Sequence, residues 1–306
     1  MAKRYYWLLA VLVILYIVSI FVLKTDSATL ARYHISDVQL KFLSLTIIIP
    51  AFAIWLAAFY SIVNTGKYAQ KIKNTPHGEG FGHLANGVVI IGLGLPITSI
   101  VGRLLTYAVQ QNAVSQAFST IVSTHLTIVF YIVGFFFLYR GARLLAGSVR
   151  AKLSQRQVSG AIGALALISA FYAFATLSDP SRMAAHAPAT TATYYMPDWL
   201  ILLTVIIPYI VIWALGFFTT LLLATYYQKV GGAIYRAALV KLNFGFFVVI
   251  LALIILQFIT TVTTNLSGWG LSALLLLVYL LLAVIAIGYV LIALGAKGLA
   301  KLEEVI

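Results

Sequence analysis

Residues 45–59 read LTIIIPAFAIWLAAF, and residues 203–217 read LTVIIPYIVIWALGF. At a constant offset of 158 positions, these stretches share eight identical residues, which include a proline and a tryptophan. The identical pairs are Leu45/Leu203, Thr46/Thr204, Ile48/Ile206, Ile49/Ile207, Pro50/Pro208, Ile54/Ile212, Trp55/Trp213 and Phe59/Phe217. The same register continues to a Tyr-x-Gln-Lys sequence and beyond, through Tyr68/Tyr226, Gln70/Gln228, Lys71/Lys229, Leu84/Leu242 and Gly87/Gly245. This agreement in one frame indicates an internal repeat.

A second match lies further along both copies. Residues 134–146 read GFFFLYRGARLLA and align with GYVLIALGAKGLA at 288–300, at an offset of 154. Gly134/Gly288 and Gly141/Gly295 coincide in this alignment, and Arg143 aligns with Lys297. The sequence therefore predicts two four-helix transmembrane repeats, residues 1–150 and 151–306, which meet in the basic segment near 147–157.

The composition places the chain in a membrane. Hydrophobic residues make up 62% of the 306 positions and charged residues only 9%. A soluble domain carries about 25% charged residues, so this chain could not cover a water-facing surface. There is no cysteine, which excludes disulfides, thiolate metal sites and covalent c-type haem.

Long apolar runs recur along the chain, and each is read as a helix because a helix satisfies its own backbone hydrogen bonds in lipid. We expect an all-α integral membrane protein with eight spans, of which the first is a retained span rather than a signal peptide. The spans are 6–23, 40–63, 84–108, 120–140, 158–177, 199–224, 242–264 and 270–294.

The basic residues predict how these spans are oriented. With the N-terminus inside, fifteen of the twenty Lys and Arg residues lie on the cytoplasmic side: Arg140, those in 64–83, 141–157 and 225–241, and those beside both termini. This bias predicts a multi-pass protein of the cytoplasmic (plasma) membrane with both termini cytoplasmic. It also accounts for the net charge of +13 without nucleic acid as a partner. Four spans per copy give parallel repeats, related by a pseudo-two-fold axis along the membrane normal.

Two proline–tryptophan pairs are the first candidate site. Pro50 and Pro208 lie inside spans and each removes one backbone hydrogen bond. Trp55 and Trp213 follow five residues later, deeper than an interfacial aromatic belt. Either these four residues line a central cavity, or the indoles fill gaps between helices that pack at a kink.

A duplicated acidic pattern lies on the predicted outer face. Asp26 and Asp179 follow spans one and five, while Asp37 and Asp198 begin spans two and six. The four carboxylates could form a cation or partner site near the axis. Capping is the favoured reading for Asp37 and Asp198, since Asp at a helix start accepts hydrogen bonds from free backbone amides.

A glycine-rich stretch before span three, NTPHGEGFGHLANG, holds a third candidate set. His77, Glu79 and His83 are ligand types for a metal, and glycines let a backbone approach a ligand closely. The spacing matches no established motif, and the second copy lacks these side chains. A polar turn and helix cap is the favoured interpretation, so we predict no metal and no cofactor.

The predicted membrane core contains few residues that could carry ions or catalyse a reaction. No Asp or Glu lies at mid-depth in a span, which disfavours a proton-driven carrier, and no catalytic residues are identified. We therefore expect a non-enzymatic binding or assembly subunit of a membrane complex, with a membrane-protein partner or a second copy of itself. The alternative is a permease or channel for a neutral or lipophilic small solute.

Overall fold

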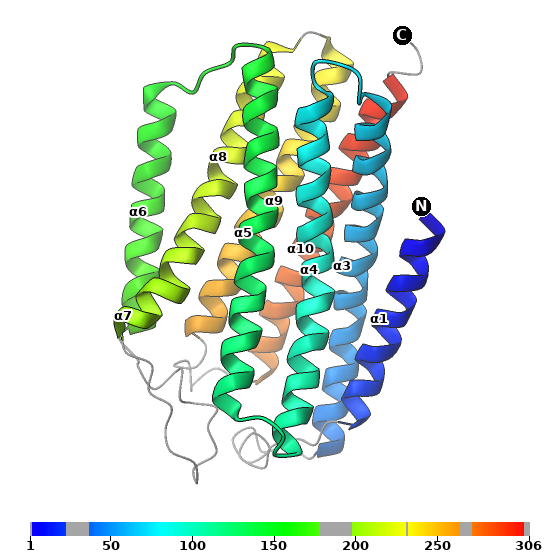
Figure 1. Ribbon diagram of the computed structural model, residues 1–306, viewed down its shortest axis with the longest axis vertical. Coiled ribbons are helices and arrows are strands. Elements are labelled where there is room, and N and C mark those ends of the chain that lie inside the picture. The colour runs from blue at the N-terminus through cyan, green and yellow to red at the C-terminus, as the bar shows by residue number, and fades with distance from the viewer. Residues whose placement is uncertain (1, 23–36, 178–197, 231, 263–270, 303–306) are drawn as a thin grey trace.

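The computed structural model describes residues 2–22, 37–177, 198–230, 232–262 and 271–302, and within these ranges every regular element is helical (Figure 1). The elements are α1 (Ala2–Val22), α3 (Asp37–Lys71), α4 (Gly78–Gln110), α5 (Gln116–Ser148), α6 (Gln155–Leu177), α7 (Asp198–Ile201), η2 (Leu202–Ile206), α8 (Ile207–Lys229), α9 (Ala233–Val262) and α10 (Leu271–Leu302). α7, η2 and α8 follow one another without a gap and form one rod.

Seven helices are long and apolar enough to cross a membrane: α3, α4, α5, α6, the α7–η2–α8 rod, α9 and α10. Their outer surfaces carry large apolar side chains that water would not tolerate, such as Leu167 and Phe174, which are 74% and 72% exposed. The chain is therefore a multi-pass membrane protein. In α1 the described apolar stretch covers Ala10–Ser19, so its role as an eighth span stays a prediction.

Six of the rods form a closed ring in the order α3, α4, α5, α8, α9, α10, in which each packs against the next and α10 returns to α3. The remaining two helices lie outside this ring, α1 against α3 and α4, and α6 against α8 and α9. Figure 1 shows α1 and α6 at opposite edges of the molecule. The contacts of α1 with α3 and α4 have counterparts in those of α6 with α8 and α9, while the two four-helix repeats stay a prediction.

The helices alternate in direction, so their connections gather at two ends. The segments 72–77 and 149–154, the end of α8 and the end of α10 lie at one end, and 111–115 lies at the other (Figure 1). The first end carries most of the described basic residues: Lys67, Lys71, Lys73, Arg140, Arg143, Arg150, Lys152, Arg156, Lys229, Arg236, Lys241, Lys297 and Lys301. We call it the basic end.

Glycines permit the closest helix contacts. A Cβ on Gly87 of α4 would lie 2.8 Å from the carbonyl oxygen of Gly134 in α5, so the backbones themselves touch. In the other half, a Cβ on Gly245 of α9 would lie 2.7 Å from the carbonyl oxygen of Gly288 in α10. Gly87 and Gly245 are aligned at offset 158, and Gly134 and Gly288 are aligned at offset 154.

Aromatic contacts follow the same correspondence. Trp55 meets Tyr16 of α1 edge to face at 5.6 Å, and Trp213 meets Tyr172 of α6 in the same way at 5.0 Å. The α1 and α6 helices are thus each held by one tyrosine on one buried tryptophan, and both indoles are at most 5% exposed.

The two tyrosines of the Tyr-x-Gln-Lys sequences join the halves at the basic end. The Tyr68 hydroxyl lies 2.5 Å from that of Tyr235 in α9, while the ring of Tyr226 lies 5.7 Å from that of His77. Since Tyr68 corresponds to Tyr226 and His77 to Tyr235, both contacts cross from one copy to the other at matching positions.

The helices are longer than the predicted spans, and the connections are shorter. α3 runs to Lys71 and α4 begins at Gly78, so the predicted loop 64–83 is reduced to six residues. The GEGFG sequence is the first part of α4 rather than a loop. Two of its three glycines lie against protein: a Cβ on Gly78 would lie 2.3 Å from the carbonyl oxygen of Ile72, and one on Gly80 would lie 2.7 Å from the Leu145 side chain.

Candidate functional site

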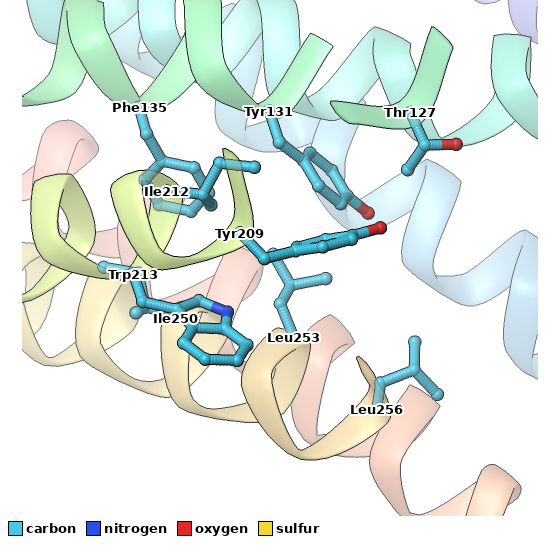
Figure 2. A pocket seen from close by; sticks show the side chains of 9 residues that line it. All are labelled: Thr127, Tyr131, Phe135, Tyr209, Ile212, Trp213, Ile250, Leu253 and Leu256. Carbon is cyan, nitrogen blue, oxygen red and sulfur yellow. The ribbon is translucent and has the colours of Figure 1, made fainter. Parts of the chain in front are cut away.

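A partly enclosed cavity of about 160 Å³ lies between α5, α8 and α9 (Figure 2). Each helix contributes positions three or four residues apart, which share one helix face. The nine lining residues are Thr127, Tyr131 and Phe135 of α5, Tyr209, Ile212 and Trp213 of α8, and Ile250, Leu253 and Leu256 of α9. We call this cavity the tyrosine pocket.

The tyrosine pocket lies near the middle of the bundle. α5 has 33 residues, and Tyr131 lies about 22 Å from its start at a rise of 1.5 Å per residue, close to half of the helix length. A group at this depth is remote from the water at either end. Polar atoms here therefore depend on the protein or on a ligand for hydrogen bonds.

Polar atoms are few in the pocket wall. Figure 2 shows the hydroxyls of Tyr131 and Tyr209 directed toward the end lined by Thr127 and Leu256. Neither tyrosine hydroxyl has a hydrogen-bond partner among the described residues, whereas Thr127 Oγ1 donates to the carbonyl oxygen of Ser123 at 2.9 Å. Because both tyrosines line the cavity, their hydroxyls are placed to form hydrogen bonds with a polar group inside it.

The wall behind these hydroxyls is a fixed aromatic cluster. The ring of Tyr209 lies 6.4 Å from that of Trp213 and 6.0 Å from that of Tyr172 in α6. Tyr172 in turn meets Trp213 edge to face. Aromatic pairs in this range contribute about 0.5–1.5 kcal/mol each beyond their buried area, so the pocket wall is set by packing before any ligand arrives.

The backbone beside the pocket departs from a regular α-helix. Residues Leu202–Ile206 form a π-helical turn, and Pro208, which lacks an amide hydrogen, stands directly before Tyr209. In the first copy, Pro50 lies inside the continuous helix α3. π-Turns of this kind are rare and recur at functional sites, because they turn the side chains that follow.

The two tyrosines of the pocket have no counterparts in the other half of the sequence. At the repeat offset, Ala51 stands where Tyr209 stands, Gly92 where Ile250 stands, and Ile285 where Tyr131 stands. Both tyrosine hydroxyls are therefore specific to one side of the molecule. Sequence reasoning that followed only the identities of the repeat missed Tyr131 and Tyr209, and the signal that could have found them is this difference between the copies.

The four residues of the predicted central cavity have separate surroundings. Trp213 lines the tyrosine pocket, while Trp55 packs on Tyr16 at the other side of the ring. α3 packs against α10 and α8 against α5, and Figure 1 shows α3 and α8 well apart. A cavity common to Pro50, Trp55, Pro208 and Trp213 stays a prediction.

A much smaller cavity lies where α4, α5, α9 and α10 meet, between the two halves. It measures about 10 Å³, and its lining is apolar apart from Tyr289: Val88, Ile91, Phe135, Leu138, Phe246, Val249, Ile250, Tyr289 and Ile292. A single water needs about 10–15 Å³ and two or more polar partners, so this cavity is too small and too apolar to hold a chain of waters.

The predicted acidic cluster lies at or beyond the edge of the described chain. Asp26 and Asp179 fall outside the described residues. Asp37 and Asp198 are the first residues of α3 and α7, although their side chains are not among those described. Their position at helix starts agrees with capping, which remains a prediction together with the cation site.

The histidine set at the basic end does not converge. His77 occupies the N-cap position of α4 without a side-chain cap, and its Nδ1 lies 3.0 Å from Ser148 Oγ. His83 Nε2 lies 3.7 Å from Glu79 Oε1, one helical turn away, and its ring packs near Phe137. In the part of the chain that the structure describes, no three His, Cys, Asp or Glu residues are placed to hold a metal ion.

No protein-family model matches this chain, and no curated protein and no solved structure is significantly similar to it. Its function therefore has to be inferred from its own cavities and charges.

Proposed function

We propose that this protein is a non-enzymatic binding subunit of the cytoplasmic membrane, built from two parallel four-helix repeats, which holds one small and mostly apolar molecule in the tyrosine pocket. The observation that carries the proposal is the pair of unpartnered hydroxyls of Tyr131 and Tyr209, which face an otherwise apolar cavity at mid-depth. Ligand sites are characteristically apolar with a few polar groups that fix orientation.

The size of the pocket limits its ligand. At about 160 Å³ it is close to the roughly 150 Å³ of an engineered apolar cavity that binds benzene, and below the range of about 300–1,000 Å³ for drug-sized ligands. Left empty, a cavity of this volume costs a packed interior about 4 kcal/mol. A single-ring compound with one hydrogen-bonding group fits both the volume and the two hydroxyls.

Binding of two matched compounds tests the proposal. In lipid nanodiscs, ¹⁹F NMR should detect 4-fluorophenol and fluorobenzene bound to the wild-type protein. Tyr209→Phe should weaken the binding of 4-fluorophenol about three- to ten-fold, because one hydrogen bond is lost. The same variant should bind fluorobenzene as tightly as the wild-type protein does. Leu253→Phe, which fills the pocket, should abolish both, and Tyr107→Phe, at an exposed tyrosine of α4, should change neither. Equal loss of both compounds in Tyr209→Phe would contradict the proposal.

Transport of such a molecule is the second candidate. The π-turn and Pro208 beside the pocket favour it, since helices with an irregular backbone are typical of transporter binding sites. Uptake of 4-fluorophenol into proteoliposomes, compared with protein-free vesicles, separates the two candidates. A saturable flux that Trp213→Leu reduces at equal protein content would replace binding by transport as the function.

A further inference from the structure

A second and larger space opens toward the basic end, between α6, α8 and α9. Its volume is about 440 Å³, and it is lined mainly by small residues of α6, such as Gly160 and Ala164, and by aromatic residues of α8 and α9, such as Phe217 and Phe244. We call it the α6 groove. It shares no lining residue with the tyrosine pocket, so an inference about it is independent of the proposed function.

The packing of α6 explains why the groove is there. Toward the other end of α6, Tyr172 fixes the helix on Trp213 and Tyr209. Toward the basic end, α6 presents glycine and alanine to its neighbours, and a Cβ on Gly160 would meet no atom within 4 Å. Small residues opposite aromatic ones leave space that no side chain of this interface fills.

The groove is amphipathic along its length. Arg156 is exposed at its mouth, and Gly160 and Ala164 lie about 6 and 12 Å further along the helix. Arg156 is the one basic residue of the lining, and α8 and α9 carry further exposed basic residues toward the same end, with Lys229 ending α8 and Arg236 and Lys241 near the start of α9. Deeper in the groove, Asn243 has a buried side-chain oxygen without a hydrogen-bond partner among the described residues.

We propose that the α6 groove binds one anionic phospholipid, whose phosphate pairs with Arg156 and whose acyl chain lies along Gly160 and Ala164 against Phe217 and Phe244. A positive mouth over an apolar channel is complementary to this molecule at both ends. A transmembrane helix of a partner fits poorly. One turn of a helix about 10 Å across already occupies roughly 440 Å³. The groove, at about 440 Å³, would therefore hold only one turn of a partner helix, which is too short a contact to bind it.

The test uses the full chain in nanodiscs, with phosphatidylglycerol and phosphatidylcholine that carry the same photoactivatable acyl chain. Mass spectrometry of crosslinked peptides should place phosphatidylglycerol on 217–227 and 240–247. Arg156→Gln should lower the preference for phosphatidylglycerol over phosphatidylcholine about five-fold, while Arg156→Lys should retain most of it. Arg143→Gln is the matched control, because Arg143 is exposed at the same end but does not line the groove.

A second pair of variants tests the apolar part. Gly160→Leu should reduce labelling of these peptides by both lipids, whereas Gly163→Leu should not, because Gly163 also has free space around it but lies outside the lining. Equal labelling by the two lipids in the wild-type protein would overturn the proposal. So would an equal loss of preference in Arg143→Gln and Arg156→Gln.

Discussion

At the level of single residues, Arg103 shows how the chain holds a positive charge within a span. Its Nη2 donates a hydrogen bond of 2.9 Å to the Tyr16 hydroxyl, and its guanidinium carbon lies 4.0 Å from the centre of the same ring. Tyr16 also contacts Trp55. One tyrosine of α1 thus binds the guanidinium of Arg103 in α4 and covers the indole of Trp55 in α3. A long basic side chain can also reach the membrane surface without any protein partner, but Arg103 is held inside the protein by this hydrogen bond and by the face of the Tyr16 ring.

Tyr16→Phe should therefore be mild and Tyr16→Leu clearly worse. The phenylalanine loses one hydrogen bond, worth about 0.6 kcal/mol on average in membrane proteins, and keeps the ring that faces Arg103 and Trp55. Leucine should lower the free energy of unfolding by roughly 1 kcal/mol more, because the contacts of the Tyr16 ring with Arg103 and with Trp55 are lost as well. Reversible unfolding in bicelles measures the difference, with Tyr107→Phe as a control in α4. Equal losses for the two variants would show that the ring contributes nothing.

At the level of helices, the glycine contacts make a prediction that tests the repeat. Gly87→Ala and Gly245→Ala should each destabilise the protein by about 1–3 kcal/mol, because the new methyl group meets a carbonyl oxygen of the facing helix. Gly82→Ala is the control in α4, since a Cβ there meets no atom within 4 Å. It should be neutral or stabilising by up to about 1 kcal/mol, because alanine favours helix. Unfolding midpoints in bicelles report all three, and a tolerated Gly87→Ala would contradict the close contact.

The helices themselves were predictable from the sequence, while their ends and the tyrosine pocket were not. Apolar runs reveal where the chain crosses lipid, but a helix continues into polar residues such as Tyr68 and Lys71 because its backbone bonds are satisfied there as well. The pocket depends on α5 packing against α8, a contact between the two copies that no local pattern encodes. Tyr131 and Tyr209 meet only through that contact and the π-turn before Pro208.

At the level of the whole molecule, the distribution of basic residues predicts which end faces the cytoplasm. The chain has no cysteine, so single cysteines introduced at exposed Asn74 and Gln111 report on opposite ends of α4. In intact cells, an impermeant thiol reagent should label Gln111→Cys, and it should label Asn74→Cys only after permeabilisation. Labelling of both in intact cells would rule out the predicted sidedness.

The arrangement of the ring makes the two halves dependent on each other. α3 of the first half packs on α10 of the second, α5 packs on α8, and Tyr68 reaches Tyr235 across the basic end. Each half alone would expose these faces, which are shaped for a neighbouring helix rather than for lipid. We therefore expect fragments 1–152 and 153–306 to co-purify as a folded complex when produced together, since both begin at the basic end and can insert independently. Either fragment produced alone should give low yield or form a dimer with itself. Affinity purification through a tag on one fragment, followed by size-exclusion chromatography, measures this, and two stable monomeric fragments that do not associate would show that the halves are separate domains.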